Sequence, residues 1–175
     1  MKREILFRGK RTDNGEWVYG SLIDSDSIVG KIVDFDEEYF IPKFWYKVVP
    51  ETVGQFTGMY DDTKWENASS FDKEYAYNLS KINGTKPKEE WKGKMIFEGD
   101  LVSFSSWKHG SHSDNPDFVF VYEIRFTRLS WYCCGDGFSL KLYQKMQDTP
   151  LNNDRCMDRI IEVIGNIYDN KELLA

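Results

Sequence analysis

The sequence predicts a mainly β protein, a small curved β-barrel with an SH3-like core and one inserted helix at about residues 70–82. Three observations lead to this fold class. Short segments in which every second residue is apolar recur along the 175 residues. Turn-forming clusters separate these segments, which are rich in β-branched and aromatic residues. Glycines stand inside several of them, and a strongly curved small barrel needs such points to bend.

The strand-like segments show their alternation most clearly in residues 117–126. Aromatic and aliphatic residues share one face there, and the other face changes from Val119 and Val121 to Glu123 and Arg125. Such a strand is covered on one side and solvated toward one end of the other. The same alternation predicts further strands at residues 16–23, 43–49, 138–143 and 159–168.

One segment has helical spacing instead. Apolar residues recur every three or four positions from Phe71 to Ile82. Ser69 precedes them and Asp72 follows three residues later, which is the pattern of a capping box. Gly84 supplies a stop signal just after the last periodic residue. The segment therefore predicts a helix from about residue 70 to 82.

The stretch "GKMIFEGDLVSF", residues 93–104, is apolar at both ends with Glu98, Gly99 and Asp100 in the middle. Glycine permits a positive φ, and an aspartate can accept hydrogen bonds from nearby amides. The stretch therefore predicts a strand, a structural turn at Glu98, Gly99 and Asp100, and a second strand. Gly54 and Gly165 interrupt two other strand-like runs, where a bulge or a tight bend is expected.

Four blocks of sequence carry a family resemblance. They are "REILFRGK" at residues 3–10 followed by "WVYG" at 17–20, "PETVGQFTGMYD" at 50–61, "GKMIFEGDLV" at 93–102 and "IEVIGNIYDNKELL" at 161–174. The last three blocks, in this order, are quite specific. On these residues the chain resembles the YopX family, small proteins found in phages and prophages of bacteria.

The resemblance implies a β-rich fold with a barrel core, and it carries no catalytic residue over to this chain. We expect a single YopX-like domain over residues 1–175. The second and third blocks usually sit close together in the family, joined by a short turn. Here residues 62–92 separate them, so we interpret this range as a helix-containing insertion within the domain.

Composition excludes some classes of protein. The net charge of −6 argues against a domain that binds duplex nucleic acid, which usually carries a basic balance. The sequence has neither a long apolar run nor the apolar core of a signal peptide, so we expect a cytoplasmic protein. Its three cysteines, Cys133, Cys134 and Cys156, fit a reducing compartment better than a disulfide framework.

No pattern of catalytic residues stands out, and we expect neither an enzyme nor a cofactor or metal. His109 and His112 are too few for a zinc site without cysteine ligands at suitable spacing. A catalytic pair of cysteine and histidine has no local signature here. The acidic runs at residues 34–38 and 61–62 lack the spacing of a calcium loop, and we interpret them as solvated charge.

The sequence favours a phage or prophage accessory protein that acts by binding a protein partner or itself. Aromatic residues make up 16% of the chain, and Trp and Tyr are enriched at interfaces. The alternative is a β-barrel that binds single-stranded nucleic acid with its basic N-terminus and a lysine-rich segment around a tryptophan. The residues of that possible interaction site are Trp91, Lys88, Lys92 and Lys94. The partner and the oligomeric state stay open.

Overall fold

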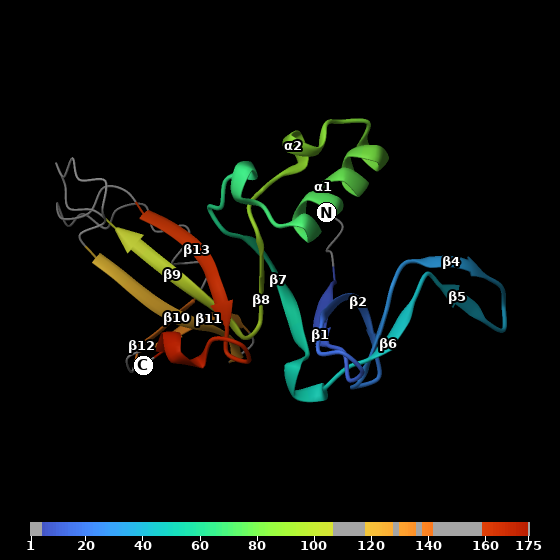
Figure 1. The fold of residues 1–175 in the computed structure, drawn as a ribbon, viewed down its shortest axis with the longest axis horizontal. Helices are drawn as coiled ribbons and strands as arrows, with labels where there is room; N and C mark the ends of the chain where they lie inside the picture. The colour runs from blue at the N-terminus through green and yellow to red at the C-terminus, as the bar shows by residue number, and fades with distance from the viewer. Residues whose placement is uncertain (1–4, 107–117, 128–129, 136–137, 142–158, 175) are drawn as a thin grey trace. The chain divides into compact units, whose positions relative to one another are not determined.

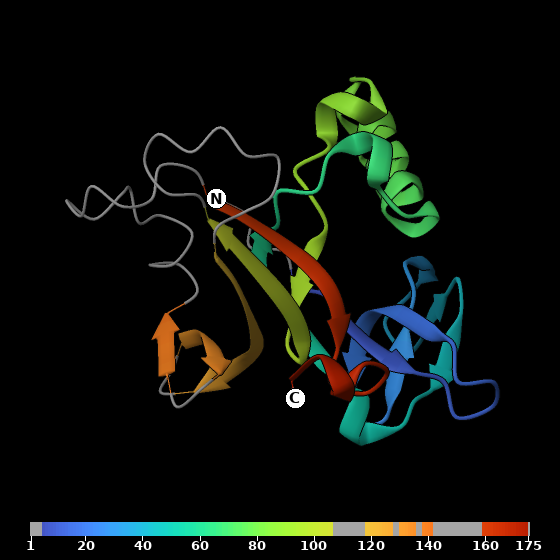
Figure 2. The same ribbon diagram turned by 60° about the vertical axis from the view of Figure 1, so that its left-hand side comes forward.

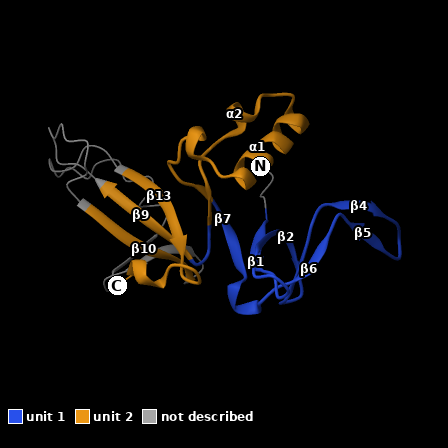
Figure 3. Ribbon diagram, in the orientation of Figure 1, with its two compact units in different colours: residues 1–58, 97–99 blue, residues 59–96, 100–175 orange. Residues whose placement is uncertain are grey.

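The computed structural model of the chain describes residues 5–106, 118–127, 130–135, 138–141 and 159–174 (Figure 1). They belong to two compact units, which Figure 3 shows in different colours. Unit 1 comprises residues 1–58 and 97–99, and unit 2 comprises residues 59–96 and 100–175. The single domain with an insertion at residues 62–92, which the sequence predicted, stays a prediction.

Antiparallel strands dominate the described residues, which confirms the prediction of a mainly β protein. They are β1 (Phe7–Lys10), β2 (Trp17–Ile23), β3 (Ser27–Val29), β4 (Ile32–Phe35), β5 (Phe40–Pro42), β6 (Trp45–Lys47), β7 (Gly54–Tyr60), β8 (Met95–Phe97), β9 (Asp100–Ser106), β10 (Phe118–Thr127), β11 (Ser130–Gly135), β12 (Phe138–Lys141) and β13 (Arg159–Asn166). Three sheets result, in the strand orders β6-β3-β2-β1-β7-β8, β12-β11-β10-β9-β13 and β4-β5. No pairing among the described residues joins the two outer strands of a sheet, so the barrel stays a prediction.

Unit 1 is built on the meander of β1, β2 and β3. Strand β1 pairs with β2 from Phe7 opposite Gly20 to Lys10 opposite Trp17. Its buried core consists of Val18, Ile28 and Val48, against which Phe7, Leu22, Phe44, Tyr46 and Val53 pack. Strands β4 and β5 form a separate hairpin, which Figure 1 shows projecting beyond the rest of this unit. The small core leaves that hairpin without cover, because all of residues 31–41 are exposed.

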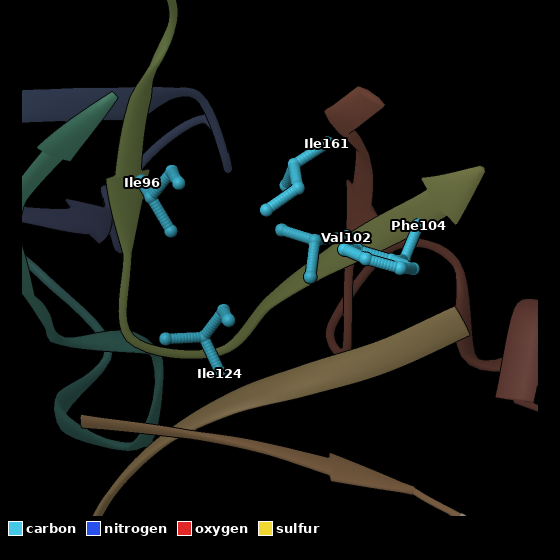
Figure 4. Close-up of a cluster of buried hydrophobic side chains, with 5 residues drawn as sticks. All are labelled: Ile96, Val102, Phe104, Ile124 and Ile161. Atoms are coloured by element: carbon cyan, nitrogen blue, oxygen red, sulfur yellow. The ribbon is translucent and has the colours of Figure 1, made fainter. Parts of the chain in front are cut away.

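Strand β9 lies between β10 and the edge strand β13 in the sheet of unit 2 (Figure 2). Val102 of β9 stands opposite Tyr122 and Val163. The buried core comprises Ile96, Val102, Phe104, Ile124 and Ile161 (Figure 4). Burial on β10 is confined to the centre of the strand, because Phe120 and Phe126 are about half exposed. The alternation of residues in this strand predicted one fully covered face. That prediction is wrong at Phe120 and Phe126.

The predicted helix is confirmed as α1 (Ser70–Asn83). The Ser69 side chain accepts a hydrogen bond from the Asp72 backbone N–H, and the Asp72 carboxylate accepts one from the Ser69 N–H. Gly84 ends the helix in the left-handed conformation, with a φ of 70°. A second helix, α2 (Pro87–Glu90), and three short 3₁₀ turns, at Pro50–Thr52, Trp65–Asn67 and Lys171–Leu174, complete the described elements.

A buried carboxylate joins three segments of unit 2. Asp61 is 3% exposed, and its Oδ1 accepts hydrogen bonds from the backbone N–H groups of Thr63 and Lys94, at 2.9 and 2.7 Å. Its Oδ2 accepts from the Thr63 hydroxyl and from the Val163 N–H, both at 2.8 Å. The backbone of Gly93 runs so close that a Cβ there would meet the Asp61 carbonyl oxygen at 1.8 Å. The glycine is therefore required for Asp61 to reach its donors.

The neighbouring carboxylate repeats this connection to β13. Asp62 Oδ2 accepts a hydrogen bond from the Ile161 N–H at 2.8 Å, and the Asp62 N–H donates to the Ile161 carbonyl at the same distance. The interpretation as solvated charge is therefore wrong for Asp61, which is buried, whereas Asp62 is exposed and accepts one backbone hydrogen bond. The Ile161 and Val163 N–H groups donate to these carboxylates from the edge of β13 that pairs with no other strand among the described residues.

Replacing Asp61 by Ala should lower the free energy of unfolding by roughly 3 kcal/mol or more, because a buried donor that loses its acceptor costs about 1–3 kcal/mol. Four donors lose their acceptor in this variant. Urea-induced unfolding followed by circular dichroism measures the change. Glu74→Ala is the control, because it removes an exposed carboxylate from α1. Equal unfolding midpoints for the two variants would contradict the role assigned to Asp61.

Replacing Ser69 by Ala should cost about 1 kcal/mol of stability, the usual contribution of an N-cap side chain. The variant loses the acceptor for the Asp72 N–H. The matched control is Ser70→Ala, one residue further along in the first turn, where no capping bond is lost. The same urea titration compares the two variants. A Ser70→Ala effect as large as that of Ser69→Ala would show that the cap is not the cause.

Candidate functional site

Exposed apolar side chains gather on the β4–β5 hairpin of unit 1. We call residues 31–43 the arm. Phe35 is 75% exposed, Val33 61% and Tyr39 54%. Further large apolar residues of the arm and of the adjoining strand β6 are also exposed, namely Ile32, Phe40, Ile41 and Trp45. The sequence of the arm thus combines strand-forming apolar residues with a complete lack of burial.

A β-bulge places the apolar residues of the arm on a common face. Ile32 stands opposite Pro42 and Phe35 opposite Phe40, with the register shift between Ile32 and Asp34. Residues three apart would point to opposite faces of a regular strand. The extra residue of the bulge restores Ile32 and Phe35 to one face, together with Phe40 and Pro42. The bulge therefore builds a continuous apolar strip along the hairpin.

This strip borders an open cleft of about 650 Å³ in unit 1. Ile32 and Phe40 of the arm line one part of the cleft, and Leu6, Ile23 and Val29 line another. Among the described residues, Ser21 and Lys31 supply the polar side chains of the lining. A small-molecule site usually has several convergent polar groups. The lining of the cleft is instead mainly apolar.

Charge on the arm is divided between its two ends. The tip between the strands carries Asp36, Glu37 and Glu38, with Asp34 just before it, and all four are exposed. Lys31 and Lys43 stand at the base, where the Lys43 N–H donates to the Lys31 carbonyl oxygen. The arm is therefore acidic at its tip and basic at its base.

The tip is an ordered turn. The Asp36 carboxylate accepts hydrogen bonds from the backbone N–H groups of Glu38 and Tyr39, at 2.8 and 3.0 Å. These bonds, that from Glu38 above all, hold the pKa of Asp36 below its ordinary value. At the turn between β2 and β3, the Lys47 ammonium group bonds to Asp26 and likewise lowers the pKa of that carboxyl. The Asp36 carboxylate is therefore ionised at neutral pH.

Comparison with known proteins identifies the family of the chain. The model of the family described as "YopX protein" matches residues 62–175, which is more than half of the chain. The chain belongs to the YopX family. Among solved structures, it is similar to the protein EF1440 from Enterococcus faecalis, with 18% sequence identity, a TM-score of 0.45, and coverage of 99% of this chain and 100% of that one. No curated protein matches.

Within this YopX chain, the residues of the predicted turn lie between β8 and β9. Glu98 and Gly99 form the turn, and Gly99 has a φ of 78°. Asp100 is the first residue of β9 and is 1% exposed. The Glu98 carbonyl oxygen accepts a hydrogen bond from Arg8 Nη2 at 3.2 Å.

The two other predicted glycines stand where the chain has no room for a side chain. A Cβ on Gly54, the first residue of β7, would meet the Glu98 carbonyl oxygen at 2.5 Å. Gly165 stands at the register shift between β13 and β9. A Cβ there would meet Asn170 Oδ1 at 2.4 Å, and this oxygen accepts from the Asn166 N–H.

The possible interaction site around Trp91 is engaged inside the YopX chain. The Trp91 indole N–H donates to the Thr63 carbonyl oxygen at 2.8 Å, and its ring meets that of Trp65 edge to face. Lys88 forms an ion pair with Glu66 at 2.9 Å. Lys94 Nζ donates to the Val163 carbonyl, and Lys92 Nζ lies 5.7 Å from the Tyr60 ring centroid. The structure brings these residues together, but as parts of the fold of unit 2.

The basic residues of the N-terminal strand are engaged in unit 1. Arg8 is 6% exposed, and its guanidinium lies 4.7 Å from the Trp17 ring centroid and 5.0 Å from that of Phe97. Arg11 lies over the Tyr46 ring and pairs with Asp13, and this hydrogen bond raises the pKa of Arg11. These cations stabilise the unit through aromatic contacts, which removes them from the open surface.

Sequence reasoning missed the arm. It took "DFDEEY" as solvated charge and passed over the apolar residues on both sides of it. Those residues are strand-forming and flank an acidic turn, which together predict a hairpin. No local sequence signal predicts that they are exposed.

Of the other candidates, His109, His112 and Cys156 lie outside the described residues. Within the described chain, no three His, Cys, Asp or Glu residues are placed to hold a metal, and no helix is long and apolar enough to cross a membrane.

Replacing Trp91 by Phe should lower the free energy of unfolding by about 0.5–1.5 kcal/mol, the net contribution of a typical hydrogen bond. The ring contact with Trp65 is largely retained, whereas the bond to the Thr63 carbonyl is lost. Tyr77→Phe is the control, because this half-exposed ring of α1 loses only a hydroxyl. Urea unfolding checks both variants. A Trp91→Phe protein as stable as the wild type would argue against a structural role for the indole N–H.

Proposed function

We propose that this YopX-family chain is a phage or prophage accessory protein of the cytoplasm that acts by binding protein through the arm, without catalysis. The observation that carries the proposal is a run of eleven consecutive exposed residues, 31–41, which holds six large apolar side chains. We also propose that the fold has a small curved β-barrel core, as the sequence predicts.

The extent of the apolar surface supports protein binding. Scattered exposed apolar residues need no explanation, but contiguous patches above roughly 300–600 Å² mark interaction sites. The four aromatic residues Phe35, Tyr39, Phe40 and Trp45 are 75%, 54%, 46% and 60% exposed. At about 200 Å² for each fully exposed residue, they alone leave on the order of 500 Å² open. Aromatic residues are also those that contribute most at binding hot spots.

A two-stranded hairpin is a further argument. Two strands alone are at best marginally stable in water, and they need a third strand or a packed surface. Strands β4 and β5 pair only with each other among the described strands, and neither has a buried residue. A partner that covers the apolar strip supplies the missing surface.

Capture from a bacterial lysate tests this function. We expect the tagged wild-type chain to retain a protein near stoichiometry, in both nuclease-treated and untreated lysate. The double variant Phe35→Asp, Phe40→Asp should lose it, because two charges are placed in the apolar strip. Ile82→Asp is the matched control, since Ile82 is 76% exposed and lies on α1, away from the arm in the sequence.

Two results would contradict the proposal. One is a protein retained equally by the wild type and by the arm variant. The other is retention of nucleic acid alone, lost after nuclease and weakened steeply by salt. That second result would favour the single-stranded nucleic-acid alternative, with the basic N-terminus and the Trp91 segment as its site.

A further inference from the structure

We propose that the partner of the arm is a second copy of this chain: the arm of one copy lies along the cleft of the other, with its acidic tip against Lys31 and Lys43 of that copy. The inference rests on the proposed function, since it names the protein that the arm binds. Its basis is the area, the shape and the charge of residues that belong to one unit.

The exposed apolar area is close to what each subunit of a stable dimer buries. To the four aromatic residues, Ile23, Ile32, Val33 and Ile41 add surfaces that are 41%, 48%, 61% and 46% exposed. The total approaches the roughly 800 Å² that each partner contributes to an interface of standard size. A short peptide would leave most of this surface open, whereas a second arm and cleft present an apolar surface of the same size.

The arm and the cleft also match in character. The apolar strip of Ile32, Phe35 and Phe40 continues directly into the cleft, because Ile32 and Phe40 belong to both. A surface of this kind is complementary to itself. The exposed rings of Phe35 and Tyr39 near the tip have the size and polarity to fill a partner's cleft, which Ile23 and Val29 line with aliphatic groups.

Charge determines the direction in which two arms meet. With their tips together, two copies would oppose eight carboxylates, which is unfavourable, since each tip region carries Asp34, Asp36, Glu37 and Glu38. With the arms antiparallel, each acidic tip meets Lys31 and Lys43 of the other copy. Neither lysine forms an ion pair with another residue in the part of the chain that the structure describes. The antiparallel arrangement thus pairs charges that a single copy leaves unpaired.

The antiparallel arrangement is also reciprocal. Each copy gives its arm and receives one, so the same surface is used twice and the assembly closes. The four residues of β4 span roughly 13 Å, so tip and base are separated enough for the two charge contacts to form independently. The exposed edges of β4 and β5 are shielded in such a pair, which removes a site for unspecific strand pairing.

Charge reversal tests the arrangement. The base variant is Lys31→Glu, Lys43→Glu, and the tip variant is Asp34→Lys, Glu37→Lys, Glu38→Lys, which leaves the turn-forming Asp36 in place and makes the tip basic. In each variant alone, every tip meets a base of like charge. In an equimolar mixture, the acidic tip of the base variant meets the lysines of the tip variant, and the lysine tip of the tip variant meets the new glutamates. Both contacts of a mixed pair are then favourable, which a surface elsewhere on the chain would not produce.

Sedimentation equilibrium and light scattering give the mass. We expect the wild type to reach twice its 20.6 kDa chain mass. Each variant should dissociate at concentrations roughly tenfold higher or more, because juxtaposed like charges weaken an interface. The mixture should regain the wild-type mass. Far-UV circular dichroism checks that the variants fold, and all five substituted residues are exposed.

The remaining outcomes separate this inference from the proposed function. A wild-type chain that is monomeric at all concentrations, but whose arm retains another protein from the lysate, overturns self-association and leaves the proposed function standing. A monomer that retains nothing overturns both. Variants that associate as the wild type does, or a mixture without recovery, overturn the antiparallel arms even if the chain self-associates.

Discussion

The hydrogen bonds of the buried Asp61 carboxylate hold unit 2 together. One side chain accepts from residues 63, 94 and 163, so it fixes three segments that lie up to 102 positions apart. The connection places β13 beside β9, and Ile161 thereby reaches the core with Val102. A carboxylate is well suited to this position, since its two oxygens accept several hydrogen bonds at once and charge-assisted bonds are strong.

In unit 1, arginine side chains connect parts of the unit by contacting aromatic rings. Their presence in the composition therefore does not by itself indicate a binding surface. Arg8 lies between the rings of Trp17 and Phe97, and Arg11 lies over Tyr46. In unit 2, the tryptophan and lysines around Trp91 likewise contact their own fold. Residues that resemble a nucleic-acid site in the sequence thus also make contacts within their own unit, although Lys88 and Lys92 remain exposed. Residues 31–41 of the arm are exposed and contact little.

The family and several local features could be predicted from the sequence. The YopX blocks at residues 93–102 and 161–174 fall within the part of the chain that the family model matches. Helix α1 begins after Ser69 and ends before Gly84, as its cap signals predict, because caps depend on residues only a few positions apart. The positive φ of Gly99 follows the same logic, since only local backbone geometry is involved.

The sequence by itself determined the family, the β-rich class, the helix and the turn, because each depends on neighbouring residues or on a recurring pattern. Only the tertiary structure decided which charges are buried and which apolar residues are not. In the sequence, Asp61 and Arg8 look like surface charges. In the structure they are buried, because their partners come from distant segments. Phe35 is a strand-forming apolar residue, and it is exposed because the small unit does not cover it. Burial depends on which remote surfaces meet, and composition and periodicity contain no information about that.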